Sequence, residues 1–257
     1  MTCINCGLQG YSKFCPNCGQ KADIKRLSIP TLWMDFQSRI YGFDGVFPRT
    51  LRDLTIRPGI ASDLFIKGNR VLYVGPVGYF FLMIAMSLLI MELLGIDFFQ
   101  MISSSSISPE LQTSTQENVT RLIIDFIYLN FRLVRFGLIP VTAFWIWMFY
   151  KKRGYNYIES SVPAFYAQGH LEILFIINVI VFYLSGIHFN DLSFIIEPLY
   201  YGFLFMPWLP ASRVRSFFNG VIIWVLSYVS FVFMIIIAAS IWVGMNPELL
   251  EKLKSSP

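Results

Sequence analysis

The sequence has few charged residues. Asp, Glu, Lys and Arg make up 14% of its 257 residues, and hydrophobic residues make up 55%. A soluble domain has about 25% charged residues. So little polar or repetitive sequence excludes intrinsic disorder, collagen, a coiled coil and a basic nucleic-acid-binding arm. The composition instead indicates a polytopic membrane protein with a small polar head.

The sequence also lacks catalytic motifs. It contains no H-E-x-x-H, G-x-S-x-G, P-loop or G-x-G-x-x-G pattern. Its two histidines, His170 and His188, are too few for a histidine-rich metal catalyst. Acid–base catalysis needs an acid and a base that reach the same reacting group, and no such pair lies at one depth of the predicted membrane region. We therefore expect a protein that is not an enzyme.

All four cysteines lie in the first 18 residues, in a C-x2-C-x8-C-x2-C pattern formed by Cys3, Cys6, Cys15 and Cys18. Each pair is followed by glycine, which allows a tight turn, and two such turns place four thiolates tetrahedrally around Zn²⁺. A stretch this short cannot bury a core, so the metal must supply its folding free energy. Four cysteines leave no open coordination position, which predicts a structural zinc ribbon over residues 1–22. The alternative is two disulfides or reactive thiols; we expect no signal peptide here, which favours zinc.

Five hydrophobic stretches are each long enough to cross a bilayer, which takes about 20 helical residues. The approximate spans are residues 71–95, 130–150, 169–189, 192–210 and 216–245. The fourth contains Glu197 followed by Pro198, so we expect it to be broken or re-entrant. The prediction is an all-α integral membrane helical bundle of about five transmembrane helices at 71–247, followed by a polar tail at 248–257.

The distribution of Lys and Arg predicts the orientation. Residues 1–73 contain 10 of the 20 basic residues, whereas the connections at 97–120 and 188–191 contain none. Because basic loops stay on the cytoplasmic side, we expect a multi-pass protein of the cytoplasmic (inner) membrane with its N-terminus in the cytoplasm. Five crossings then place the C-terminus outside, and a fourth span that does not cross would return it to the cytoplasm.

Residues 23–70 predict basic amphipathic helices beside the membrane. Apolar residues, most of them aromatic, recur at helical spacing over residues 33–47. Acidic residues interrupt the basic ones, so we expect no nucleic-acid binding. Either this segment lies in the lipid headgroup layer, or it has a solvated or tertiary-packed face and its arginines only follow the positive-inside bias. The residues predicted to contact headgroups are Arg49, Arg52, Arg57, Lys67 and Arg70.

Polar residues inside the predicted spans are candidate sites, because such residues are costly in a bilayer. Glu197 is the best candidate for binding a substrate or ion, since a broken helix exposes backbone groups beside it. Arg132 and Arg135 either extend to the headgroups or form an anion site. Asn178 is suited to a hydrogen bond between helices.

Two parts of the sequence resemble a family of bacterial membrane proteins classed as a domain of unknown function. The first is Phe14-Cys15-Pro16-Asn17-Cys18-Gly19-Gln20; the second comprises Arg49-Thr50-Leu51, Arg57-Pro58-Gly59, Gly68-Asn69-Arg70 and Tyr73. That family commonly has a basic residue where Asn69 stands. The resemblance covers about residues 1–80 and implies a zinc ribbon joined to a multi-span helical domain, with no catalytic residue. The order of segments is also similar to the five-span Yip1-type proteins, which have a cytosolic N-terminus.

Two functions are compatible with these features. The first is a non-enzymatic membrane protein whose cytoplasmic zinc ribbon docks a protein partner or assembles the helices. The second is a small transporter or lipid-handling protein that uses the polar residues around the fourth span.

Overall fold

The described part of the chain is predominantly helical. A computed structural model describes residues 2–10, 13–22, 28–30, 45–96, 131–187, 190–208 and 212–245. The α-helices and the two 3₁₀ turns are, in order, α2 (Val46–Ile56), α3 (Pro58–Ile66), α4 (Pro76–Leu94), α7 (Phe131–Tyr150), η1 (Lys151–Arg153), α8 (Tyr157–Ser185), α9 (Asn190–Phe205), η2 (Met206–Trp208) and α10 (Arg213–Met245). Most of the aromatic stretch predicted at 33–47, and the whole tail at 248–257, fall outside the described residues.

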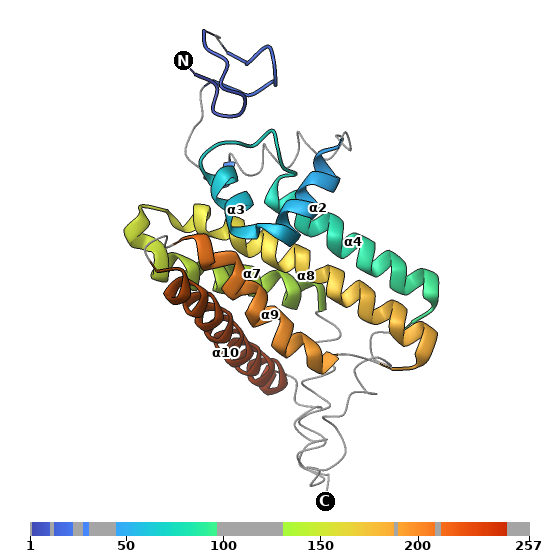
Figure 1. The fold of residues 1–257 in the computed structure, drawn as a ribbon. Coiled ribbons are helices and arrows are strands. Elements are labelled where there is room, and N and C mark those ends of the chain that lie inside the picture. Colours follow the sequence, from blue (N-terminus) through green and yellow to red (C-terminus); the bar gives the residue numbers. More distant parts are fainter. Residues whose placement is uncertain are drawn as a thin grey trace, which may run out of the picture.

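Helix α8 lies in the middle of the bundle. It packs against α4 and α7, while α10 packs against α9 and α7 (Figure 1). Helices α2 and α3 lie at the end of the bundle nearest the ribbon, where both contact α8 and α3 also contacts α9. One hydrophobic core joins all these helices. Its buried side chains include, one from each α-helix in chain order, Leu54, Phe65, Tyr79, Ile146, Tyr166, Leu204 and Ile223.

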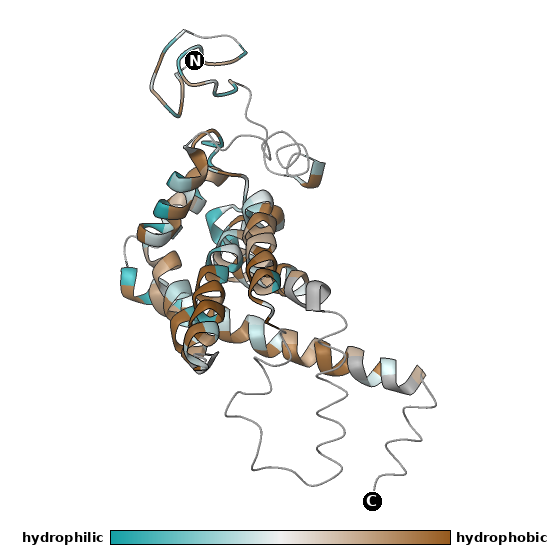
Figure 2. Ribbon diagram, turned by 90° about the vertical axis from the view of Figure 1, so that its right-hand side faces the viewer, coloured by the Kyte–Doolittle hydropathy of each residue, from teal (hydrophilic) through white to brown (hydrophobic). Residues whose placement is uncertain are grey.

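Three of the described helices are long and apolar enough to cross a membrane: α4, α8 and the Arg213–Trp242 part of α10. Large apolar side chains are exposed along the outside of α10. Val229 is 63% exposed and Phe233 is 64% exposed. Figure 2 shows the same hydrophobic character along the long helices. Such a surface is unfavourable in water and favourable against lipid chains. The described residues therefore have the architecture of a helical membrane protein.

The helix boundaries correct two expectations about the spans. Helix α9 runs without a break through Pro198, and the α-helix gives way to a 3₁₀ turn only at Met206. Proline removes one backbone donor, but a helix tolerates this loss when neighbouring helices hold it in place, and α9 packs against both α8 and α10. Helix α8 also begins well before residue 169, at Tyr157.

The early start of α8 is encoded by a capping box. The Asn156 side chain accepts a hydrogen bond from the Glu159 backbone N–H, and the Glu159 carboxylate accepts one from the Asn156 N–H. Two backbone donors that the helix leaves open are thereby satisfied. The first turns of α8 contain polar residues that a hydropathy pattern excludes from a span, and these turns are buried inside the protein.

Glycines allow three helix pairs to approach closely. A Cβ on Gly59 of α3 would overlap the backbone carbonyl oxygen of Leu204 in α9, and a Cβ on Gly220 of α10 would overlap that of Tyr201. On α8, a Cβ on Gly169 would lie 2.9 Å from the Cα of Phe80 in α4. Small residues at such crossings are typical of helix packing in membranes, where close van der Waals contact replaces hydrophobic burial.

Candidate metal centre

Two turns of the same kind form the ribbon. In the first, the Cys3 N–H donates to the Leu8 carbonyl at 2.8 Å and the Gly7 N–H donates to the Cys3 carbonyl at 2.9 Å. In the second, Cys15, Gly19 and Gln20 repeat both bonds at 2.8 Å. Gly7 and Gly19 have φ values of 76° and 70°, a conformation that glycine adopts without steric cost. The repeated Cys-x2-Cys-Gly pattern therefore produces two matching turns, as the sequence predicts.

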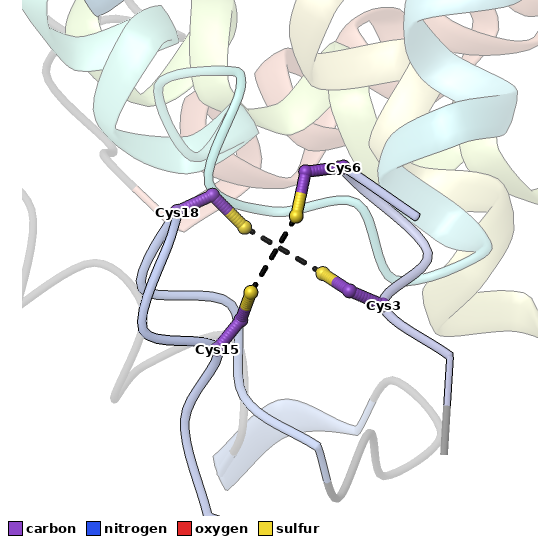
Figure 3. Close-up of side chains that lie close together, drawn as sticks. All are labelled: Cys3, Cys6, Cys15 and Cys18. Atoms are coloured by element: carbon purple, nitrogen blue, oxygen red, sulfur yellow. Dashed lines mark hydrogen bonds between the residues drawn. The ribbon is translucent and has the colours of Figure 1, made fainter. Parts of the chain in front are cut away.

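The four sulfur atoms converge on one point (Figure 3). Each contributes one candidate ligand atom, and all four lie within 4.8 Å of one another. The Sγ atoms of Cys3 and Cys18 are 3.5 Å apart, as are those of Cys6 and Cys15. A disulfide would need about 2.05 Å, whereas a tetrahedral ion with metal–sulfur bonds of about 2.3 Å needs about 3.7 Å between sulfurs. The cluster therefore fits one metal ion and holds no disulfide.

The thiols differ in how readily they ionise. Burial raises the pKa of Cys3, but backbone N–H groups of Cys6 and Asn5 and the nearby thiols outweigh it and lower the pKa to about 6. The Leu8 N–H, together with the Asn17 side chain, lowers the pKa of Cys6. Burial raises the pKa of Cys15 to about 11. Since metal ligands must be thiolates, a bound cation is needed to hold Cys15 ionised at neutral pH.

The ribbon contacts the helical domain through Gln20. This side chain is 3% exposed, and its Nε2 donates to the Gly68 carbonyl at 3.0 Å. Gly68 belongs to residues 67–75, which join α3 to α4 and are called the linker below. At the other end of the linker, the Val74 N–H donates to the Thr50 Oγ1 at 2.9 Å, and the Tyr166 hydroxyl donates to the Val74 carbonyl at 2.7 Å. The linker thus connects the ribbon to α2 and α8.

The buried Asp53 carboxylate on α2 binds the linker through a hydrogen bond from Tyr73. Asp53 accepts hydrogen bonds from Arg57 at 2.9 Å, from Arg52 at 2.9 Å and from the Tyr73 hydroxyl at 3.0 Å. Burial opposes ionisation, but these donors outweigh it and hold the pKa of Asp53 below its usual value. Burial, together with Asp53, raises the pKa of Tyr73 to about 12. Asp53 is therefore a carboxylate at neutral pH and joins α2 to the linker.

Two of the residues predicted to contact headgroups bind this carboxylate. Arg52 and Arg57 pair with Asp53, and Lys67 pairs with Asp63 at 2.6 Å. The Arg52 and Lys67 side chains nevertheless remain 61% exposed. Arg49 is exposed, and Arg70 is partly exposed. Helices α2 and α3 pack on the bundle, so the alternative of a tertiary-packed segment holds for their apolar side and for Asp53. The basic side chains of Arg49, Arg52 and Arg57 are exposed.

The sequence pattern did not reveal a buried polar cluster around His170. His170 of α8 is 7% exposed and lies between Tyr79 and Tyr200, with ring centroids 6.4 and 5.4 Å away. Its Nδ1 is 3.0 Å from the Tyr79 hydroxyl, and its Nε2 is 3.2 Å from the Thr55 Oγ1. Thr55 already donates its proton to the Leu51 carbonyl, so Nε2 carries the hydrogen and Nδ1 accepts one from Tyr79. The cluster joins α2, α4, α8 and α9.

The structure describes the side chains of two of the four predicted intramembrane site residues, Glu197 and Asn178. The Glu197 Oε2 of α9 accepts hydrogen bonds from the Trp224 Nε1 at 3.0 Å and from the Tyr228 hydroxyl at 2.6 Å, both on α10. Asn178 is buried in α8 at 6% exposure. Arg132 and Arg135 are on α7, but their side chains fall outside the described residues.

One comparison with known proteins gave a match. The sequence model of a family described as "Protein of unknown function (DUF3667)" matches residues 44–88, which contain α2, α3, the linker and the first part of α4. The chain is similar to that family over this stretch, and the predicted resemblance to a family of unknown function is confirmed there. The four cysteines lie outside it. Neither the curated proteins nor the solved structures gave a match.

Proposed function

We propose that this chain is a non-enzymatic protein that crosses the cytoplasmic membrane five times, and that its cytoplasmic ribbon binds one structural Zn²⁺ and docks or assembles a protein partner. The observation that carries the proposal is a four-sulfur cluster attached to a bundle with three membrane-length helices. Four thiolates in tetrahedral array are a typical structural zinc site. Because all four positions belong to the protein, the metal stabilises the ribbon and leaves no position for a substrate.

The packing of the loops supports the proposed orientation. Asp63 of α3 accepts a hydrogen bond from Tyr155 and lies 3.8 Å from Arg153, in the basic turn that follows α7. The Arg153 guanidinium also lies over the ring of Trp208, just before α10. These contacts bring the basic segments after α7 and before α10 to the end of the bundle that bears α3. Basic residues from separate loops therefore gather on one side, as the positive-inside rule requires for a cytoplasmic face.

Exposed apolar side chains support a docking role for the ribbon. Ile4 is 51% exposed, Leu8 is 39% exposed and Phe14 is 55% exposed. A ribbon this small presents few side chains, and apolar ones facing water are typical of interaction surfaces. We propose that the charged groups of Arg49, Arg52, Arg57, Lys67 and Arg70 contact lipid headgroups.

Metal analysis of the purified protein tests the zinc site. Protein prepared in detergent without oxygen is expected to contain one zinc per chain, and Cys15→Ser is expected to abolish metal binding while the helical domain stays folded. Finding no metal in the unsubstituted protein refutes the zinc site.

Crosslinking in intact membranes tests the docking role. A photoreactive residue at Leu8 is expected to capture a protein partner, and adding Cys15→Ser is expected to remove that product. A crosslink that persists without the cysteine would show that the folded ribbon is not the docking element.

The second candidate, a transporter or lipid-handling protein, depends on Glu197. The two hydrogen bonds from α10 hold this carboxylate between helices and favour a role in packing. Alanine substitution at Glu197, described in the Discussion, separates the two functions.

A further inference from the structure

The two turns of the ribbon expose one pair of equivalent residues, Leu8 and Gln20, to different degrees. Leu8 and Gln20 correspond, because the carbonyl of each accepts the N–H of the first cysteine in its turn. Leu8 is 39% exposed, whereas Gln20 is 3% exposed. The backbone hydrogen bonds are alike, but the Gln20 side chain is buried against the helical domain whereas the Leu8 side chain is exposed.

The Gln20 amide reaches a backbone group at the end of α3. The Gly68 carbonyl that accepts its hydrogen bond is 48 residues away in the sequence. Gly68 has a φ of 103°, and the N–H of the next residue, Asn69, donates back to the Leu64 carbonyl at 3.0 Å. Asn69 is itself 6% exposed. The contact is therefore a buried joint between the ribbon and the C-terminal turn of α3.

The position of Gln20 depends on the metal site. Gln20 lies two residues after Cys18, and its own carbonyl accepts the Cys15 N–H, so the turn that holds the metal also holds this side chain in place. The ribbon has no core of its own, and without metal the turn loses its main source of folding free energy. Loss of metal therefore releases the Gln20 side chain from Gly68.

We propose that metal binding by the ribbon and ordering of the linker are thermodynamically coupled through Gln20. The inference rests on the proposed metal site but makes a separate claim: the metal-bound ribbon stabilises the linker, and the linker in turn tightens metal binding. This reciprocity is a requirement of linkage. Through Val74 and Asp53 the coupling extends to α2 and α8, so the metal state of the ribbon sets the stability of the membrane-proximal layer.

The test compares Gln20→Ala with Leu8→Ala, the equivalent substitution in the other turn, in the full-length protein in detergent. Zinc affinity is measured by competition with a coloured chelator, and hydrogen exchange is measured over residues 67–75. Removing one buried hydrogen bond weakens zinc binding about two- to tenfold in Gln20→Ala. Zinc-bound Gln20→Ala also exchanges its linker amides as fast as the zinc-free parent protein. Leu8→Ala is expected to match the parent protein in both measurements.

Two outcomes overturn the coupling, and a third concerns the metal site itself. If Gln20→Ala has the zinc affinity and the linker hydrogen exchange of the parent protein, Gln20 does not couple the metal site to the linker. If the parent protein binds zinc but its linker exchanges at the same rate with and without the metal, the coupling is absent although the ribbon is a zinc site. If the parent protein binds no zinc, the proposed metal site fails, and the coupling fails with it.

Discussion

Replacing Gly59 with alanine tests the close contact between α3 and α9. The added Cβ would overlap the Leu204 carbonyl oxygen and would lie 2.7 Å from the Pro207 Cγ and 3.1 Å from the Leu204 carbonyl carbon. Neither a backbone group nor a proline ring can rotate away, so α3 must move outward. That movement also lengthens the hydrogen bond from the Trp208 Nε1 to the Gly59 carbonyl, now 3.1 Å.

The expected loss combines two terms. Overpacking costs about 1–3 kcal/mol, and the weakened hydrogen bond adds up to about 1 kcal/mol. For a chain of this size, each kcal/mol lowers the melting temperature by roughly 2–4 °C. Gly59→Ala is therefore expected to melt roughly 2–16 °C lower when unfolding in detergent is followed by circular dichroism.

Gly75 provides a matched control. A Cβ there meets nothing within 4 Å, and its φ of −54° suits any residue. Gly75→Ala loses only the preference for glycine at a helix N-cap, about 0.5 kcal/mol. Equal melting temperatures for the two variants would refute the contact between α3 and α9.

Three further predictions concern charge, topology and function. Asp53→Asn is expected to destabilise the protein by about 2–3 kcal/mol at pH 7, because it removes charge-assisted hydrogen bonds. The pKa of Asp53 is lowered by folding, so its contribution to stability is present above the unfolded value of about 3.9 and is lost as the pH falls through the lower folded value. Denaturant unfolding should therefore show the difference in unfolding free energy between variant and parent closing below about pH 4. A difference that stays constant with pH would contradict this. A reporter fused after Lys152 should read cytoplasmic and one at Ser105 external, and the reverse pattern would invert the topology. Glu197→Ala should lower thermal stability but leave partner crosslinking intact. If cells with this variant lose the protein's function while cells with Cys15→Ser keep it, transport is favoured.

The local features were predictable because neighbouring residues determine them. The matching turns of the ribbon follow from cysteine and glycine spacing, and the boundary between α2 and α3 follows from Pro58, which occupies the first position of α3. The approximate ranges of the long helices follow from hydropathy. In each case the information lies within a few residues or within one periodic stretch.

The long-range contacts were not predictable from one sequence. His170 contacts Thr55 and Tyr79, which are 115 and 91 residues away, and nothing in the local pattern marks these three as neighbours. The break expected at Pro198 was wrong for a similar reason, since the packing of α9 against other helices keeps it continuous. The capping pair Asn156 and Glu159 was a local signal that could have located the start of α8.

The bond between Trp208 and Gly59 has a consequence for biosynthesis. The two residues are 149 positions apart, and ribosomes add about 5–20 residues per second. Some 7–30 s therefore pass between the synthesis of Gly59 and the arrival of its partner. For most of that interval α9 has not yet been made, so α3, which is synthesised early, completes its packing late. In a nascent chain halted before residue 190, which lacks α9, α3 should therefore be cleaved by added protease more readily than in the complete chain.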